Sequence, residues 1–491
     1  MRPTLRLLTA SACLASLAAG TLAANAGLTP VDLTAVSSYL ATHGAAADAS
    51  EGGGTVAGAT PQAKCGPGSL PETGRQGRVP TADYESGRAA QGYTCNAEQV
   101  GHYGRSGGFQ VHRYVDATGR ECAYYDSTLL FPNDPITTQS EPGTYVLDMS
   151  DPANPVRTAF LPTYATSSPH ESLRLNTERG LLVAVGGSPA TAPGLVDVYD
   201  VSGDCRQPVL KSSTPLGFFG HESGFSVDGK TFYVATTSQA NIIAIGLEDP
   251  AVPTFLWQSS EWTSHGMNLS DDGTRLYVTD MDNNGITILD VSDIQARKAD
   301  PQVREISKLT WPEASIPQNS IPVTIKGKKY LVEVDEYSRN VTSYDPMSPV
   351  GAARIIDISD ETRPKVVSNI RLEVNQPEAR RDDQKDDPGA QYGVQGYAGH
   401  YCSVPQREEP GIVACSFILS GLRVFDIRNP EKPKEIAYFN QPAPIGFPLK
   451  SGAYAMSAPA FAPERNEIWY SDGNSGFYNV RLTNDVWPRR K

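Results

Sequence analysis

A short recurring pattern restricts the folds open to this chain more than any other feature of the sequence. A glycine opens a run of β-branched or aromatic residues, an aspartate ends the run, and Ser, Asp, Asn or Pro follow. The clearest copies are Gly143–Pro152, Gly285–Asp293 and Gly421–Pro430. Each copy has the composition of one β-strand that ends in a tight turn.

The pattern occurs seven times, at intervals of 44 to 69 residues. Its aspartate, or the residue in that place, lies at Asp148, Asp200, Gly246, Asp290, Asp357, Asp426 and Asn479. A repeat of this length, made of strands and turns, is typical of β-propellers. We therefore predict an all-β fold, a seven-bladed β-propeller of four-stranded blades.

The seventh repeat lacks sequence for an outer strand, because little follows Leu482. The segment Ala97–Tyr103 resembles the fourth strand of other repeats, such as Glu435–Phe439. We expect this N-terminal strand to complete the last blade, since an open ring would leave strand edges exposed.

Four segments resemble the LVIVD repeat of exported and surface proteins of bacteria and archaea: Gly143–Pro155, Gly285–Asp293, Ala353–Pro364 and Gly421–Pro433. The resemblance covers most of residues 95–487, but the aspartate is absent at Gly246 and Asn479. It implies a β-propeller with a surface or extracellular location. The family carries no assigned reaction and no catalytic residues, so the resemblance implies none here.

The N-terminus has the features of a cleavable signal peptide. Arg2 and Arg6 precede the largely apolar stretch Leu7–Leu22, and Ala24–Ala26 fits a small-residue cleavage site. We predict a signal peptide over residues 1–26, a low-complexity and disordered lead-in over 27–64, and a single propeller domain over 65–491. No later segment is apolar over the length needed to span a bilayer. The mature protein is predicted to be secreted, with association to the cell wall left open.

The cysteines support this location. Six remain after removal of the signal, an even count that predicts three disulfides in an exported chain. Cys402 and Cys415 flank the turn Arg407–Pro410 symmetrically, which predicts opposed positions in a hairpin and a direct bridge. The other four are predicted to form two bridges on or near the first, second and seventh repeats, with the pairing left open: Cys65, Cys95, Cys122 and Cys205.

The net charge of -13 argues against binding to nucleic acid, which requires basic surfaces. We predict a monomer whose partner is an extracellular protein, a glycan or a small molecule. The charged run Arg380–Pro388 is too polar for a core, and it is predicted to be a solvated loop.

Histidines are the most informative candidates for a site. Four of the seven stand where the first strand of a repeat begins: His170, His221, His265 and His400. The first strand of a propeller blade is innermost, so these side chains are predicted to face a common cavity at one mouth of the channel. His112 lies near the equivalent point of the first repeat.

Carboxylates accompany these histidines. Glu171 and Glu222 directly follow two of them, and the loops between second and third strands open on the same face. Those loops contribute Asp126, Asp280, Asp282, Asp335, Glu336 and Asp472. Imidazole and carboxylate groups suit a transition metal, zinc or copper, with Glu171, Glu222, Asp280 and Asp335 as supporting ligands. The sequence favours a structural role over this metal site, because WD-repeat propellers place a Gly-His pair before the first strand to tie each blade together, and Gly220–His221 and Gly399–His400 fit it.

No catalytic motif settles the function. The sequence has no Gly-rich phosphate loop, no His-Glu-x-x-His and no Gly-x-Ser-x-Gly. This favours an extracellular binding or scaffold propeller over an enzyme. The alternative is a metal-dependent enzyme whose histidine-lined site lies at one mouth of the channel.

Overall fold

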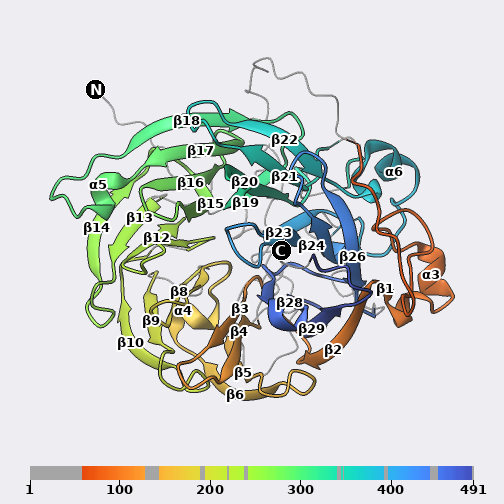
Figure 1. The fold of residues 1–491 in the computed structure, drawn as a ribbon, viewed down its shortest axis with the longest axis horizontal. Coiled ribbons are helices and arrows are strands. Elements are labelled where there is room, and N and C mark those ends of the chain that lie inside the picture. The colour runs from red at the N-terminus through yellow and green to blue at the C-terminus, as the bar shows by residue number, and fades with distance from the viewer. Residues whose placement is uncertain are drawn as a thin grey trace, which may run out of the picture.

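The computed structural model describes residues 58–127, 143–187, 194–217, 220–236, 242–339, 344–346, 348–391, 396–442 and 452–488. Seven antiparallel sheets are arranged in a ring about a common centre (Figure 1). The chain is therefore a seven-bladed β-propeller, as the repeat predicts. Residues 1–26, the predicted signal peptide, lie outside the described residues, as does the lead-in up to residue 57.

Each blade runs from an inner strand at the channel to an outer strand at the rim. The first blade is β3 (Val111–Val115), β4 (Glu121–Asp126), β5 (Thr144–Asp148) and β6 (Val156–Leu161). The second is β7 (Leu173–Asn176), β8 (Leu181–Val185), β9 (Val196–Asp200) and β10 (Val209–Thr214). The third is β11 (Gly224–Phe225), β12 (Thr231–Ala235), β13 (Ile242–Gly246) and β14 (Thr254–Ser259).

The remaining blades follow the same order. The fourth is β15 (Ser264–Leu269), β16 (Arg275–Asp280), β17 (Gly285–Asp290) and β18 (Arg304–Thr310). The fifth is β19 (Ile316–Ile325), β20 (Lys328–Glu336), β21 (Ala353–Asp357) and β22 (Lys365–Ile370). The sixth is β23 (Gly399–Ser403), β24 (Ile412–Phe417), β25 (Gly421–Asp426) and β26 (Lys434–Asn440). The seventh is β27 (Ala460–Ala462), β28 (Glu467–Asp472), β29 (Gly476–Leu482) and β2 (Ala97–Tyr103).

Helices within the described residues are short. They are α3 (Thr81–Glu85), η1 (Ala89–Gln91), α4 (Tyr164–Ser167), α5 (Ser292–Gln295), η3 (Glu373–Asn375), α6 (Pro377–Asp382), η4 (Ile418–Ser420) and η6 (Pro463–Arg465). None of these described helices combines the length and apolar character that crossing a membrane requires.

The hydrophobic core lies between neighbouring blades. The middle strands are buried along their length, as in β8 and β12, whose side chains pack together in one cluster of the second and third blades. A strand buried on both faces can be apolar at every position, which explains the continuous β-branched runs of the repeat.

The N-terminal strand closes the ring as predicted. β2 pairs antiparallel with β29, and Ala97 lies opposite Leu482. The preceding strand β1 (Tyr93–Cys95) adds a fifth strand to the sixth blade by pairing with β26, which the sequence analysis missed. The last part of the predicted lead-in also contacts the blades, since the Thr60 amide donates to the carbonyl of Arg371 at 2.8 Å.

Three disulfides fasten the ring. Cys402 and Cys415 are opposed in the β23–β24 hairpin and bridged, as predicted. A second bridge joins Cys122 of the first blade to Cys205 of the second. The third joins Cys65 to Cys95, which lies in β1 on the sixth blade, next to the seventh.

The prediction of a solvated loop at Arg380–Pro388 was wrong in part. Arg380 lies in α6 and its side chain is buried. Asp387 is also buried, and its carboxylate accepts hydrogen bonds from the guanidinium of Arg78 at 2.8 and 3.0 Å. Arg78, in the N-terminal segment and distant in the sequence, offsets the cost of burying this charge.

Candidate metal centre

The four predicted histidines meet at the channel. The ring centroids of His170 and His221 are 4.8 Å apart, and those of His221 and His265 are 4.1 Å apart. His400 joins through Glu171, whose Oε1 lies 3.6 Å from His400 Nε2. All four side chains are buried. The structure therefore brings together residues from four blades, while their role as metal ligands remains a prediction.

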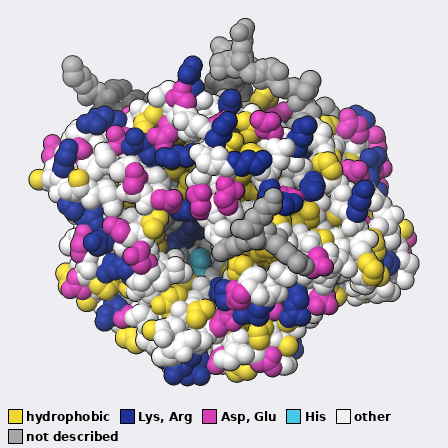
Figure 2. Space-filling model, viewed as in Figure 1, with side chains coloured by type: hydrophobic (Ala, Val, Ile, Leu, Met, Phe, Trp, Pro, Cys, Tyr) yellow, Lys and Arg dark blue, Asp and Glu magenta, His cyan; other side chains and the backbone are white. Residues whose placement is uncertain are grey.

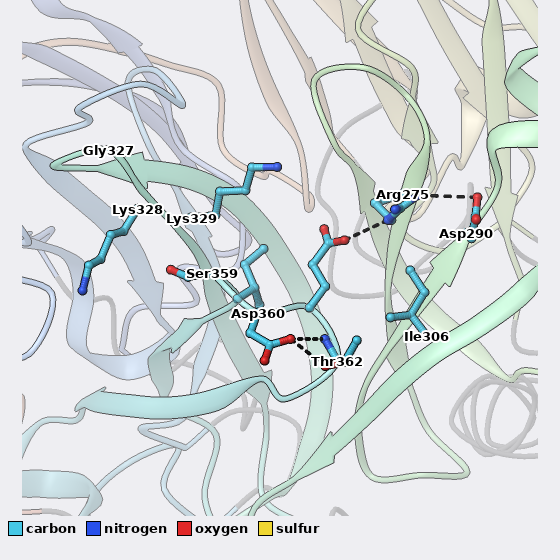
Figure 3. Close-up of a pocket in the computed structure, with 11 residues that line it drawn as sticks. Arg275, Asp290, Ile306, Gly327, Lys328, Lys329, Ser359, Asp360 and Thr362 are labelled. Carbon is cyan, nitrogen blue, oxygen red and sulfur yellow. Dashed lines mark hydrogen bonds and ion pairs between the residues drawn. The ribbon is translucent and has the colours of Figure 1, made fainter.

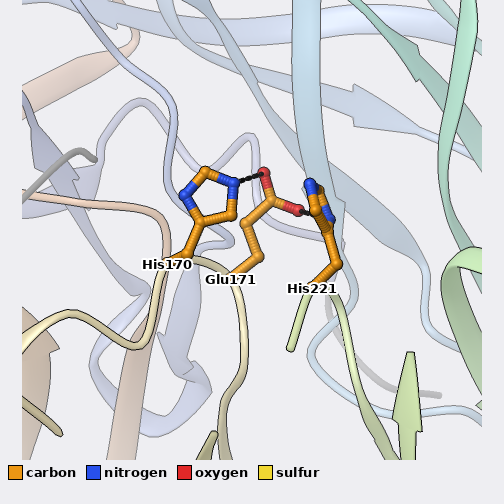
Figure 4. Close-up of side chains that lie close together, drawn as sticks. All are labelled: His170, Glu171 and His221. Atoms are coloured by element: carbon orange, nitrogen blue, oxygen red, sulfur yellow. Dashed lines mark ion pairs between the residues drawn. The ribbon is translucent and has the colours of Figure 1, made fainter. Parts of the chain in front are cut away.

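Glu171 lies at the middle of the cluster (Figure 4). Its Oε2 is 2.8 Å from His221 Nδ1, and its Oε1 is 3.8 Å from His170 Nε2. The same carboxylate accepts hydrogen bonds from the hydroxyl of Tyr401 at 2.8 Å and from the side-chain amide of Gln318. One buried carboxylate thus contacts side chains from the third, fifth and sixth blades.

A second carboxylate, Glu336, completes the cluster from the end of β20. Its Oε2 is 2.8 Å from His400 Nε2, and its Oε1 is 3.3 Å from His265 Nε2. Two sets of three side chains each place donor atoms within 4.8 Å of one another: His170, Glu171 and His221, and Glu171, Glu336 and His400. Both sets have the composition and spacing of a site for one metal ion, and they share Glu171.

β-Bulges aim three of these side chains into the channel. The inner strands of the fourth, fifth and sixth blades each carry one extra residue near their start, and these residues are His265, Gln318 and His400. A bulge turns its extra side chain away from the normal alternation of the strand. The repeat therefore positions equivalent residues at one level of the channel, with Gln318 in the place of a histidine.

Hydrogen bonds to the next blade fix two of the imidazoles. His265 Nδ1 lies 2.7 Å from the carbonyl oxygen of Pro317, and His400 Nδ1 lies 2.8 Å from that of Met456. A neutral imidazole that donates from Nδ1 carries its lone pair on Nε2, the atom that faces Glu336. These contacts run between blades, whereas the structural alternative for the histidines placed them within their own blade.

Two ring nitrogens lack hydrogen bonds despite their close carboxylates. His221 Nδ1 and His400 Nε2 are buried and form no regular hydrogen bond among the described residues; each faces a carboxylate oxygen at 2.8 Å, of Glu171 and of Glu336. Buried polar atoms are normally satisfied. A metal ion bound to these nitrogens and to Glu171 would satisfy them, so the donor set fits a transition metal.

Burial and neighbouring charges shift the pKa values of the carboxylate and the histidines in this cluster. Burial alone would raise the pKa of Glu171, but the positive charges available at His221, His170 and His400 hold it well below its usual value. Burial lowers the pKa of His221, and Glu171 more than offsets this, so that its pKa is raised. Burial, together with neighbouring His221, lowers the pKa of His265 to about 4. At neutral pH His265 is thus an unprotonated imidazole, the form that binds metals.

Backbone conformation is unusual at two positions of the site. His170 has φ of 52° and Tyr337, next to Glu336, has φ of 48°. A left-handed conformation is rare for bulky residues and is held only where the surroundings enforce it. Eight other described non-glycine residues share this conformation, so it indicates constraint at these two positions and not a function by itself.

Aromatic rings form a wall on one side of the cluster. The Phe109 ring centroid lies 4.5 Å from that of His170 and 5.4 Å from that of His400. Tyr337 and Tyr401 lie 5.3 and 5.0 Å from His400 by the same measure. The cluster therefore combines buried polar donors with an apolar wall, as small-molecule sites do.

Among the predicted carboxylates, the structure places Glu171 against the histidines but holds Asp280 and Asp335 elsewhere. Asp280 accepts from the Thr287 hydroxyl at 2.7 Å, and Asp335 accepts from Arg354 at 2.9 Å. Neither belongs to the two sets of donor atoms found in the described residues. Each of these carboxylates stabilises its own blade, and Glu336 takes the position that the sequence analysis gave to Asp335.

Glu222 lies beside the cluster but has other partners. Its Oε1 accepts from Arg174 at 2.9 Å and from the side-chain amide of Asn319. Burial raises its pKa to about 7 against the opposing charge of Arg174. His112 also lies apart, with its Nε2 2.7 Å from the carbonyl oxygen of Leu173. The space-filling view shows a histidine near the centre of one face, with acidic and basic side chains interspersed around it (Figure 2).

The comparisons with known proteins find distant structural likenesses alone, and these carry no argument about this chain. No family model and no curated protein sequence matches the chain. Among solved structures, a periplasmic gluconolactonase of Pseudomonas aeruginosa is 12% identical, with a TM-score of 0.49 over 73% of this chain and 92% of that one. A hydrazine synthase of Kuenenia stuttgartiensis is 11% identical, with a TM-score of 0.47 over 78% of this chain and 98% of that one. Neither likeness supports an argument about activity.

Proposed function

We propose that this protein is an exported propeller whose function depends on a transition metal ion, zinc or copper, held at the channel by His170, His221, His265, His400, Glu171 and Glu336. The observation that supports it is the position of Glu171 among three histidines, two of which have a ring nitrogen without a hydrogen bond among the described residues. Two carboxylates would offset the charge of one divalent ion in this buried setting.

The metal would act as a Lewis acid or as a redox centre for a small molecule. The aromatic wall of Phe109, Tyr337 and Tyr401 would exclude water from one side of the ion and contact the apolar part of that molecule. Tyr401 donates to Glu171, so its hydroxyl would orient a metal-bound carboxylate. This proposal favours the metal-dependent enzyme over a scaffold, whose support is the propeller fold alone.

Export remains part of the proposal. Three disulfides are consistent with an oxidising compartment outside the cytoplasm. The signal peptide over residues 1–26 and membership of the LVIVD repeat family are proposed on the sequence. Fractionation of cells that express the full chain, with N-terminal sequencing of the mature protein, tests the first; a start at any residue before Gly27 argues against cleavage after Ala26.

Elemental analysis tests the metal centre directly. The mature protein, purified without a metal-chelating tag and loaded with zinc or copper, should retain a stoichiometric amount after gel filtration. The double substitution His221→Ala with His265→Ala should abolish retention and leave the fold intact by circular dichroism. His102→Ala is the matched control, because His102 lies exposed on β2 and contacts the carbonyl of Ser475.

The outcomes separate the two interpretations of the histidines. Wild type that retains neither metal overturns the proposal. A double variant that retains metal like wild type but unfolds at a lower temperature identifies the histidines as structural links between blades.

A further inference from the structure

In a groove between the fourth and fifth blades, an arginine is compensated by neighbouring carboxylates (Figure 3). The Arg275 guanidinium pairs with Glu361 at 2.8 Å and with Asp290 at 3.5 Å. Asp360 accepts a hydrogen bond from the Thr362 hydroxyl at 2.6 Å. These groups satisfy one another, so they do not require a bound ion.

A second cavity, of about 270 Å³, differs from this groove in its charges. It lies at the rim of the fifth blade, between the end of β22, the residues that precede β21, and α6. Two arginines line it, Arg371 and Arg380, and its walls include four prolines: Pro312, Pro346, Pro349 and Pro377.

Arg371 is buried without a full set of partners. Arg371 is only 4% exposed, and its Nη2 donates to the carbonyl oxygen of Val350 at 3.0 Å. Its Nε and Nη1 are buried and have no hydrogen-bond partner among the described residues. A buried charge that is not paired is costly, so these two donors call for an acceptor.

Arg380 presents a second guanidinium to the same cavity. It is 5% exposed, and it donates to the backbone carbonyls of Ser348 and Asp345. Within the described part of the chain, neither Arg371 nor Arg380 forms an ion pair with a carboxylate. Burial lowers the pKa of Arg371 to about 10, and the positive charges of Arg354 and Arg380 add to this effect.

The acidic groups near the cavity do not neutralise the positive charges of Arg371 and Arg380. Asp335 is engaged by Arg354 at 2.9 Å and by the Trp311 indole at 3.1 Å. Glu313 lines the cavity and is half-buried, and Asp345 acts on Arg380 from outside the lining. Since Glu313 is the one lining carboxylate among the described residues, the two guanidiniums leave a positive charge in excess there.

We propose that this cavity binds a small organic carboxylate. Nε and Nη1 of Arg371 lie on different edges of the guanidinium, and Nη2 belongs to both edges. Nη2 gives one N–H to Val350, so its second N–H can act together with Nε or Nη1 and donate to the two oxygens of a carboxylate, which is the geometry that arginine favours. The proline walls and Val350 offer an apolar surface for a short carbon chain or a ring. This site is separate from the histidine cluster, and it does not depend on a metal ion there.

Calorimetric titration of the mature protein with sodium butyrate and sodium benzoate tests the proposal, with sodium sulfate as the inorganic oxyanion and sodium chloride as the salt control. Wild type should bind a carboxylate saturably and more tightly than sulfate. Arg371→Met should weaken that binding about tenfold or more, because it removes charge-assisted hydrogen bonds. Arg381→Met is the matched control, because Arg381 lies on α6 beside Arg380 but is exposed and paired with Asp382 at 2.8 Å. This control variant should bind carboxylate like wild type.

Thermal unfolding without added carboxylate separates binding from structure. Arg371→Met should unfold at the wild-type temperature or above it, because it removes a buried charge without a counterion. If that variant fails to fold, Arg380→Met and Arg371→Lys replace it and should also weaken binding. No saturable carboxylate binding by wild type, equal binding by all variants, or tighter binding of sulfate would each overturn the assignment.

Discussion

Replacing Glu171 by Gln should abolish the thermal stabilisation that a bound metal gives to this protein. Glu171 contacts His170, His221 and His400, and it is the carboxylate shared by both sets of candidate ligands. Glutamine keeps the volume and one acceptor for Tyr401, but it removes the negative charge. The substitution therefore separates metal binding from packing.

The size of the effect follows from mass action. A ligand that binds only the folded state at about 1,000 times its Kd stabilises that state by about 4 kcal/mol. A domain of roughly 400 folded residues has an unfolding entropy near 0.8 kcal/mol per degree at about 2.1 cal/mol/K for each residue. Wild type should therefore unfold about 5 °C higher with zinc or copper than after chelation.

Differential scanning calorimetry of each variant, with metal and with chelator, measures this difference. Each protein is its own reference, so any loss of stability that Glu171→Gln causes in the metal-free state cancels. Asp280→Asn is the matched control, because Asp280 ends β16 outside the cluster and bonds to Thr287. Wild type and Asp280→Asn should show the same shift, and Glu171→Gln none. An equal shift in Glu171→Gln would refute the assignment of Glu171 as a ligand.

Three further predictions concern the stability of the ring. Removing the Cys122–Cys205 bridge, which spans 83 residues, should lower the free energy of unfolding by about 4 to 5 kcal/mol in denaturant titrations; a loss below that of the Cys402–Cys415 bridge, which spans 13 residues, would contradict the dependence on loop length. Arg423→Met leaves the buried carboxylates of Glu72 and Glu435 unpaired and should cost about 3 to 5 kcal/mol, measured by urea unfolding; an unchanged midpoint would show that they are neutral in the native state. Burial opposes ionisation of Asp116, but the Thr118 hydroxyl and backbone N–H groups, including that of Cys205, lower its pKa. Its stabilisation is present above about pH 4 and is lost as the pH falls through the folded-state pKa, so Asp116→Asn should flatten the fall in melting temperature below pH 4; an unchanged slope would exclude this cause.

The sequence predicted the architecture because the number of repeats gives the number of blades. Seven copies of one strand and turn require seven equivalent units, and the absence of an outer strand in the last unit indicated that β2 would supply it. The fifth strand of the sixth blade was not predictable in this way. β1 is only three residues long, and it is held by pairing with β26 and by the Cys65–Cys95 bridge, both distant in the sequence.

The choice of carboxylate was beyond the reach of the sequence. Asp335 and Glu336 are adjacent at the end of β20, so their side chains point to opposite faces of the strand. A shift of one residue along β20 would exchange them. The histidines were predictable because they start equivalent inner strands, whereas two adjacent acidic residues do not reveal which of them faces the histidines.

Some departures from regular structure lie at the candidate centre. Three inner strands bulge at His265, Gln318 and His400, while His170 and Tyr337 adopt left-handed conformations. Bulges also lie between the third and fourth strands of all seven blades, so a bulge by itself does not mark a site. The inner bulges differ in the side chains that they carry, which are histidine at two of them and glutamine at the third. These three side chains come from separate blades and contact Glu171 or Glu336, which is the arrangement that a ligand site shared between blades requires.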